Sequence, residues 1–149
     1  MEFAIKLNDI TKSFGEVKAL DGISFDVKIG EWVSVMGPSG SGKSTLVNIL
    51  SLMDEPTSGR YLLGGDDASR LSDEDTLKFR REKIGLIFQQ FHLIPYLNCV
   101  ENVMIAQYYH SAVDEEDAKK ALERVGLGHR LTHRPSQLSG GEQQRLCIA

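Results

Sequence analysis

The sequence has few cysteines, no long apolar run and no excess of positive charge, and each shortage excludes a class of protein. Its two cysteines, Cys99 and Cys147, lie far apart without a CxxC partner, which is typical of free thiols in a reducing cytosol. No apolar stretch approaches the roughly 20 residues of a membrane span, and Met1-Glu2-Phe3 does not begin a signal-peptide pattern. The net charge of −4 argues against binding nucleic acid through bulk charge, so we expect no nucleic-acid partner.

The sequence is otherwise that of an ordinary globular domain. Its 149 residues, with 41% hydrophobic and 26% charged side chains, exclude collagen-like, disordered and disulfide-rich miniprotein classes. This length is typical of one domain and is enough to bury a sizeable core. There is no internal repeat, low-complexity tract or clear linker. The function therefore has to be inferred from local motifs.

Apolar patterns predict strands in two parts of the chain. Alternating apolar residues predict strands over residues 3–8 and 25–29, and a third strand is expected over residues 32–36. The short connection between the last two predicts that they form a hairpin. A short apolar run over residues 84–88 predicts one further buried strand.

Helical spacing and capping residues predict four helices, in addition to a helix near residue 140 that is described with the second motif below. Apolar residues spaced one turn apart favour a helix over residues 46–53, which the sequence at 56–59 is expected to end. Residues 72–83 read as a helix with a serine cap, acids in the first turn and bases in the last. Two more helices are expected to start near Val100 and at the acidic residues 114–117. We interpret that acidic run as a solvated helix start rather than an interaction patch.

Residues 37–45 (GPSGSGKST) match the pattern GxxxxGK[ST] and lie between a predicted strand and a predicted helix. Glycines permit left-handed backbone angles, so that successive N–H groups can surround an anion at the positive end of the helix dipole. Lys43 would reach the β- and γ-phosphates, and the Ser44 hydroxyl would ligate Mg²⁺. The alternative is a glycine-rich turn with a surface lysine. The motif predicts a nucleoside triphosphate site with these contacts: Gly37, Ser39, Gly40, Ser41, Gly42, Lys43, Ser44 and Thr45.

A second motif, residues 138–145 (LSGGEQQR), offers a hydroxyl and two glycine amides at a predicted helix start. Such a helix start can bind a second anion. The alternative is a capping box, because Ser139 and Glu142 have the S-x-x-E spacing. The two interpretations are compatible, although a capping box alone would not require glycines, which cost about 1 kcal/mol each inside a helix.

With both motifs, the sequence resembles the nucleotide-binding domain of ABC (ATP-binding cassette) transporters over essentially its whole length. Residues 37–45 resemble the Walker A loop, and 138–145 resemble the LSGGQ signature with Glu142 in place of the commonest glutamine. Residues 88–91 (FQQF) and 135–141 (PSQLSGG) most resemble the subgroup that serves lipoprotein release, macrolide export and cell-division permeases.

The resemblance implies a fold and further site residues. It implies an α/β fold: a partial P-loop NTPase core with an antiparallel β layer over residues 1–90, and a helical subdomain with the signature over 91–149. Phe14 lies where the family places an aromatic that stacks on adenine; the alternative is a core side chain. Gln89 corresponds to the Q-loop glutamine, which contacts Mg²⁺ and the attacking water, and Gln90 is the weaker candidate.

The resemblance also implies the mechanism and the partners. Two cassettes, identical or different, close head to tail on two ATP molecules, so that Ser139, Gly140 and Gly141 contact the γ-phosphate bound by the other subunit. Hydrolysis of ATP opens this dimer and drives a transmembrane permease. The expected location is therefore cytoplasmic, peripheral on the inner face of the cell membrane.

The sequence departs from the family pattern at its end. It stops at Ala149, inside the predicted signature helix, and the family's Walker B aspartate, catalytic glutamate and switch histidine lie beyond that point. We therefore expect a C-terminally truncated cassette. A polypeptide of these residues is expected to bind ATP but to hydrolyse it slowly, because it offers no identified general base.

Three other function classes remain open from the sequence. A DNA-repair or chromosome-maintenance ATPase shares both motifs, but the stretch between Gln89 and Leu138 has no sustained heptads for a coiled coil. A ribosome-associated ATPase of this family usually carries two cassettes. The third alternative is an inactive nucleotide-binding fragment.

Overall fold

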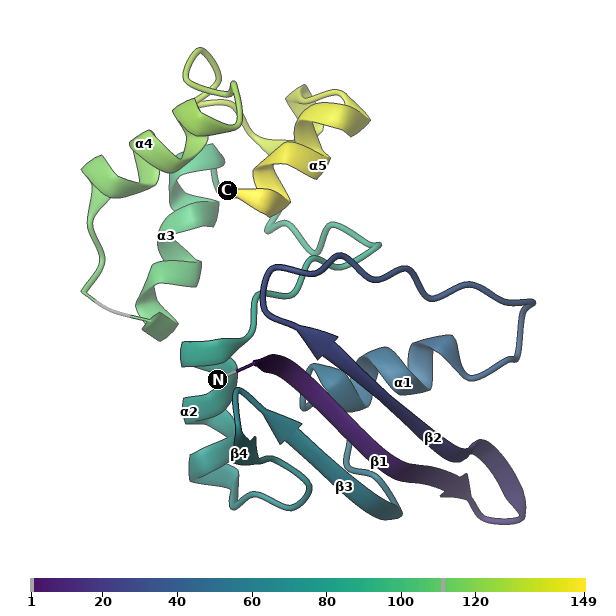
Figure 1. Ribbon diagram of the computed structural model, residues 1–149. Helices are drawn as coiled ribbons and strands as arrows, with labels where there is room; N and C mark the ends of the chain where they lie inside the picture. The colour runs from purple at the N-terminus through teal and green to yellow at the C-terminus, as the bar shows by residue number, and fades with distance from the viewer. Residues whose placement is uncertain (1, 111) are drawn as a thin grey trace. The chain divides into compact units, whose positions relative to one another are not determined.

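The computed structural model describes residues 2–110 and 112–149, and the chain forms two compact units (Figure 1). The first is Met1–Gly85 and the second is Leu86–Ala149. The sequence led us to expect the boundary after residue 90. The first unit contains a sheet with two helices, and the second is helical, so the fold is mixed α/β with an antiparallel layer, as expected.

The sheet of the first unit has four antiparallel strands in the order β2-β1-β3-β4. Their bounds are β1 (Phe3–Phe14), β2 (Val17–Lys28), β3 (Ser58–Leu63) and β4 (Asp66–Asp67). The central strand β1 places Leu7 opposite Phe25 of β2 and opposite Tyr61 of β3. Leu7 and Tyr61 are both about 1% exposed, so this cross-strand group lies in the core.

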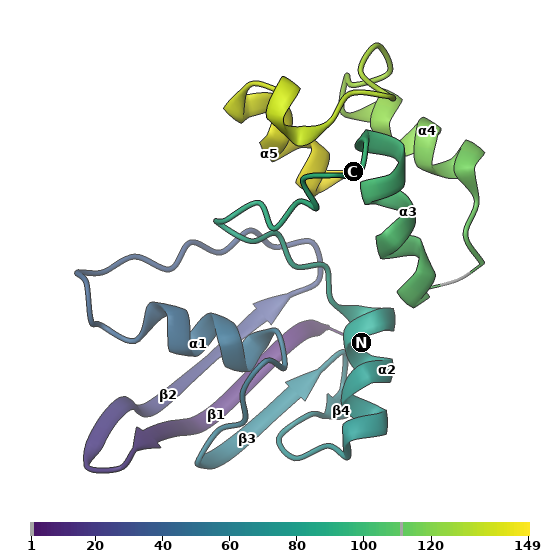
Figure 2. The same ribbon diagram turned by 180° about the vertical axis from the view of Figure 1, so that it is seen from behind.

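Helix α1 (Lys43–Leu50) covers one face of this sheet (Figure 2). Leu46 and Ile49, one turn apart, are the buried side chains of α1, as the helical spacing predicts. The buried core of the unit is the following set: Leu7, Ile10, Leu20, Leu46, Ile49, Leu52, Tyr61, Leu63 and Ala68. Because this core holds α1 against the strands, it fixes where the N-terminus of α1 lies.

Helix α2 (Asp73–Lys83) completes the first unit and confirms the predicted capped helix. The Ser72 hydroxyl accepts a hydrogen bond of 3.1 Å from the Asp75 amide. Acids occupy the first turn and bases the last, which complements the helix dipole. Phe79 of α2 packs, partly buried, against the core of the unit.

The second unit consists of the helices α3 (Cys99–His110), α4 (Glu115–Arg124), η1 (Pro135–Gln137) and α5 (Gly140–Ile148). Its buried core is Cys99, Val100, Val103, Ala118, Leu122, Leu127, Leu138 and Leu146. The Asp114 carboxylate caps α4 by accepting from the amides of Glu116 and Asp117, so the acidic run is a helix start, as interpreted. Burial raises the pKa of the Cys99 thiol above its usual value.

Two predicted strands are wrong. Residues 32–36 and 84–88 are extended or irregular and pair with no strand in the part of the chain that the structure describes. The hairpin forms instead between β1 and β2, through Gly15 and Glu16. A strand needs a hydrogen-bonded neighbour, and all four strands of the sheet pair among themselves.

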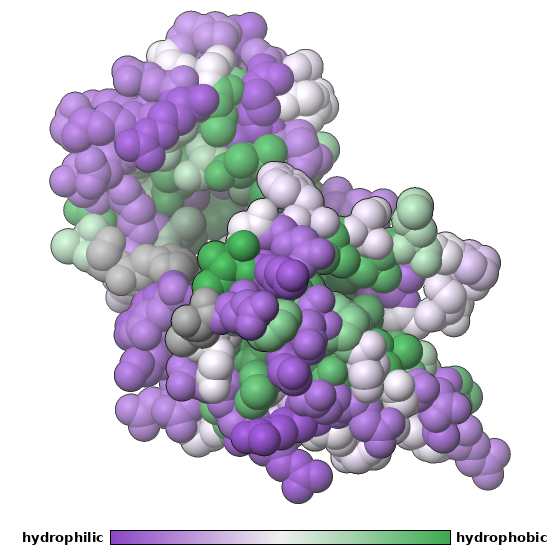
Figure 3. Space-filling model, in the orientation of Figure 1, coloured by the Kyte–Doolittle hydropathy of each residue, from purple (hydrophilic) through white to green (hydrophobic). Residues whose placement is uncertain are grey.

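The unpaired segment leaves apolar side chains in solvent. Trp32 is 98% exposed and Met36 is 86% exposed. Apolar side chains are visible at the surface of both units (Figure 3). Among the described residues, no helix combines the length and apolar character needed to cross a bilayer.

Candidate nucleotide-binding site

The glycine-rich loop leads from the extended residues 32–36 into helix α1. Gly42 is the N-cap of α1 and has a left-handed backbone, with φ of 86°. A Cβ atom on Gly42 would lie 2.5 Å from the carbonyl oxygen of Ala19 and 2.9 Å from the Leu20 side chain. Only glycine fits this position, because the loop turns into the helix directly against β2.

The N-terminus of α1 presents unpaired amides. Its cap residue makes no side-chain hydrogen bond, and its first turn holds no acid. Within residues 2–110 and 112–149, the amides of Gly40, Gly42, Lys43 and Ser44 donate to no protein acceptor. In contrast, a serine or aspartate side chain caps each of α2, α4 and α5. The start of α1 therefore combines free N–H groups with the positive end of a helix dipole, an arrangement suited to a phosphate.

The Lys43 ammonium group lies over this loop. Its Nζ donates to the carbonyl oxygens of Gly37 and Pro38, at 2.7 Å each, and lies 3.4 Å from the Ser41 hydroxyl. These contacts join the end of the loop to its beginning. A lysine has a flexible stem and a compact charge, so it can exchange carbonyl oxygens for phosphate oxygens without a change in the backbone.

The Ser44 hydroxyl is exposed, and among the described residues it has no hydrogen-bond partner. It can ligate a divalent cation, since hydroxyl oxygen is a ligand that Mg²⁺ accepts. The described residues contain no cluster of three acidic, histidine or cysteine side chains that would hold a metal ion. A single hydroxyl ligand is compatible with Mg²⁺ bound to a nucleotide, because Mg²⁺ usually takes few protein ligands and several phosphate or water oxygens.

Phe14 is the last residue of β1 and its side chain is 54% exposed, so its interpretation as a core residue is wrong. It pairs with Val17 across the hairpin, and the Lys12 Nζ lies 5.0 Å from the centre of its ring. Val17 precedes Ala19, the residue beside Gly42, by two positions of β2, which corresponds to about 7 Å along a strand. Phe14 thus lies in the same unit as the loop, on the hairpin whose strand β2 contacts Gly42.

Gln89 and Gln90 lie in the second unit, in an irregular segment before α3, and both are exposed. The neighbouring Phe88 ring meets the His92 ring edge to face, with 5.1 Å between centroids. The structure thus places Gln89 in a different unit from Lys43.

The signature segment forms the start of α5 in the second unit. The Ser139 hydroxyl accepts from the Glu142 amide at 3.3 Å, and Glu142 Oε2 accepts from the Ser139 amide at 2.8 Å. The predicted capping box is therefore confirmed. Gly140 has open space around its missing side chain, and across the described residues the amides of Gly140 and Gly141 have no protein acceptor.

Arg130 and His133 lie outside both sequence motifs; Arg130 contacts the signature segment, and His133 contacts Arg130. Arg130 Nε donates to Glu142 Oε1 at 3.0 Å, and its Nη1 donates to His133 Nε2 at 3.2 Å. Hydrogen bonds from Ser139, followed by that from Arg130, lower the pKa of the Glu142 carboxyl to about 2. No local pattern signals the pair, because Arg130 lies in an irregular segment 12 positions before Glu142 of α5.

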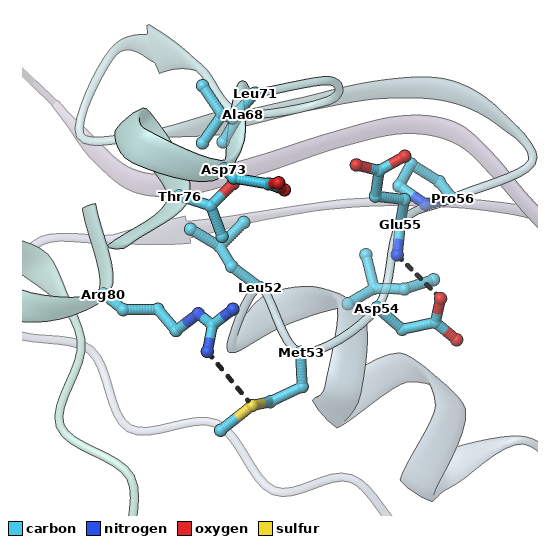
Figure 4. Close-up of a pocket in the computed structure, with 11 residues that line it drawn as sticks. Leu52, Met53, Asp54, Glu55, Pro56, Ala68, Leu71, Asp73, Thr76 and Arg80 are labelled. Carbon is cyan, nitrogen blue, oxygen red and sulfur yellow. Dashed lines mark hydrogen bonds between the residues drawn. The ribbon is translucent and has the colours of Figure 1, made fainter. Parts of the chain in front are cut away.

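A separate cavity of about 160 Å³ lies between α1 and α2 in the first unit (Figure 4). Arg80 reaches into it and donates from Nη1 to Met53 Sδ at 3.6 Å. Asp54, Glu55 and Asp73 also line it, so its charges are mixed. None of its lining residues belongs to the glycine-rich loop, and the phosphate contacts predicted from the sequence lie elsewhere.

Comparison with known proteins agrees with these motifs. The family model described as ABC transporter matches residues 20–149. An uncharacterised ABC transporter ATP-binding protein of Thermotoga maritima is 48% identical over 156 residues, covering 100% of this chain and 67% of that protein. A macrolide export ATP-binding/permease protein, MacB of Brucella abortus, is 48% identical over 152 residues, covering 97% of this chain and 24% of MacB.

Solved structures agree as well. A dimeric ATP-binding cassette in a post-hydrolysis state with ADP and Pi aligns with a TM-score of 0.84 at 40% identity, covering 97% of this chain and 67% of that one. The cbiO1 protein of Clostridium perfringens, part of an ABC transporter complex, aligns with a TM-score of 0.86 at 26% identity, covering 99% and 60%. The chain thus spans 67% or less of these relatives. By the family match over residues 20–149 and these identities, the chain belongs to the ABC transporter family.

Proposed function

We propose that this chain is the ATP-binding part of an ABC transporter, which couples binding and hydrolysis of MgATP to substrate movement by a membrane permease. The observation that carries the proposal is the uncapped start of α1, which has free amides and whose first residue, Lys43, holds its ammonium group against the same loop. A triphosphate offers the charge and the acceptor oxygens that this arrangement lacks.

Each residue of the loop has a role in this proposal. The amides of the Walker A loop hold the β- and γ-phosphates, and Lys43 neutralises part of their charge. Ser44 ligates the Mg²⁺ that accompanies ATP, and Phe14 stacks on adenine with its exposed face. Gln89 contacts Mg²⁺ and the attacking water, as the family's Q-loop glutamine does.

A second cassette completes the site. The free amides of Gly140 and Gly141, with Ser139, would bind the γ-phosphate of ATP held on the partner's loop. A dimer bridged in this way binds ATP much better when closed than when open, so hydrolysis shifts the population towards the open state. The dimeric cassette among the similar structures supports this arrangement.

The transport partner is a permease at the inner face of the cell membrane. Two relatives support this, because MacB is described as an ATP-binding/permease protein and cbiO1 as part of a transporter complex. The permease selects the substrate, so the residues of this chain do not identify it.

The test is a titration of the chain with a fluorescent ATP analogue. Lys43→Ala should weaken binding by at least about tenfold, since it removes a charge-assisted contact to phosphate. Lys78→Ala, which removes an exposed lysine on α2, is the matched control and should leave the affinity unchanged. Equal affinities for Lys43→Ala and the original chain, or no binding by the original chain, would contradict the proposal.

A further inference from the structure

Glu142 places a carboxylate next to amides that the proposed function assigns to a phosphate. It is the third residue of α5, directly after Gly140 and Gly141. A negative charge at this position stabilises the helix but repels an incoming anion, since like charges within a few ångströms interact strongly even in partly solvated surroundings. The signature of this chain therefore needs a group that compensates Glu142.

Arg130 is placed to compensate it. The two oxygens of Glu142 are divided between two partners, Arg130 Nε at 3.0 Å and the Ser139 amide at 2.8 Å. The Glu142 side chain is only 14% exposed and that of Arg130 is 35% exposed, so water screens the pair less than it screens a surface ion pair.

The position of Arg130 is itself held by the second unit. Its Nη1 donates to His133 Nε2, and the His133 carbonyl oxygen accepts from the amide of buried Cys99 at 2.9 Å. The guanidinium is thereby tied to the start of α3 and not only to α5. Arg145 adds a second cation beside the signature, with its Nη1 3.8 Å from where a Cβ of Gly141 would lie.

We propose that Arg130 is a positioning residue of the signature, which neutralises Glu142 so that the amides of Gly140 and Gly141 can donate hydrogen bonds to the γ-phosphate of ATP held by a second cassette. The proposal rests on the proposed function, because it assumes that this segment binds nucleotide held by a partner. It assigns Arg130 a role that depends on the charge of residue 142.

Because the role of Arg130 depends on the charge of residue 142, single and double variants should behave differently. Removing Arg130 alone leaves an uncompensated carboxylate beside the phosphate. Glu142→Gln removes that charge, while the amide oxygen can still accept from the Ser139 N–H. Arg130→Met should therefore weaken binding between two cassettes, and adding Glu142→Gln should restore that binding, although the double variant regains no contact.

The experiment measures MgATP-dependent self-association of the full chain by sedimentation velocity. Arg130→Met should weaken association by about tenfold, and Arg130→Met with Glu142→Gln should return it to within about threefold of the original chain. Nucleotide affinity of the isolated chain's own loop should be the same in all variants. The Arg130→Met defect should also shrink at about 0.5 M salt, because screening weakens the repulsion.

Thermal unfolding of each variant separates this role from a structural one. If Arg130→Met unfolds at lower temperature, Arg130→Gln replaces it, because glutamine keeps a hydrogen bond to Glu142 without the charge and should show the same defect and the same rescue. The proposal is overturned if both Arg130 variants associate as strongly as the original chain. It is also overturned if the double variant associates as weakly as the Arg130 single variant. If the original chain shows no MgATP-dependent association, the proposed dimer itself is contradicted, and this inference with it.

Discussion

The hydroxyl group of Tyr61 donates a hydrogen bond of 2.8 Å to the carbonyl oxygen of Leu50, which joins β3 to the last turn of α1. Tyr61 is about 1% exposed, and burial raises its pKa well above the ordinary value. The contact satisfies one of the carbonyl groups that a helix leaves unpaired at its C-terminus. It therefore holds the end of α1 opposite to the phosphate loop.

Tyr61→Phe should lower the free energy of unfolding by about 1 kcal/mol, because it leaves the Leu50 carbonyl unpaired in the core. Urea denaturation followed by circular dichroism measures the change. Tyr96→Phe is the matched control, since Tyr96 is 71% exposed and its change should stay within about 0.5 kcal/mol. Equal effects of the two substitutions would contradict this role of Tyr61.

Gly42→Ala should lower the free energy of unfolding by about 1–3 kcal/mol, because it strains a left-handed residue whose new Cβ meets Ala19. Gly140→Ala is the comparison. Gly140 has an ordinary φ and no atom within 4 Å of its missing Cβ, so stability should change by less than about 0.5 kcal/mol. Chemical denaturation measures the free energy of unfolding of both variants. If Gly42→Ala leaves this free energy unchanged, the loop does not require glycine at that position.

Phe14→Ala should weaken binding of ATP but not of inorganic triphosphate, because the proposed contact of the ring is with the base and not with the phosphates. The expected loss for ATP is about 1 kcal/mol, the lower end for base–aromatic stacking. Isothermal titration calorimetry with both ligands measures the difference. Val17→Ala, which changes the exposed residue opposite Phe14, is the control; a similar loss for both ligands would assign Phe14 a structural role.

The stability contributed by Glu142 should depend on pH. Its pKa falls from 4.5 to about 2 on folding, so the folded state favours the ionised form. The stabilisation is fully present above pH 4.5 and is lost as the pH falls towards 2. The original chain should therefore be more stable than Glu142→Gln at pH 7, and the difference should shrink below pH 4.5. Urea midpoints at pH 7, 5, 4 and 3 test this, and a difference that does not vary with pH would show that the ion pair contributes nothing.

Features that depend on neighbouring residues in the sequence were predicted correctly. The caps of α2 and α5 follow from Ser72 and Ser139, each with its partner three positions later. The helix after the glycine-rich loop follows from the spacing of Leu46 and Ile49. The roles of Gln89, Phe14 and the loop in nucleotide binding remain predictions.

Features that depend on distant partners were not predicted correctly. Residues 32–36 have the composition of a buried strand, but no neighbouring strand pairs with them in residues 2–110 and 112–149. Strand β3 was missed because Pro56 and Gly59 suggested only a turn, whereas pairing with β1 extends Ser58–Leu63.

The sequence by itself determined the family, the glycine loop with Lys43, and the capped start of α5, because each is encoded within a few consecutive residues. Only the tertiary structure decided that Phe14 is exposed, that Gly42 abuts β2, and that Arg130 reaches Glu142. The reason is physical. Local hydrogen bonds and backbone angles follow from adjacent residues, whereas burial and ion pairing depend on which distant segments the folded core brings together.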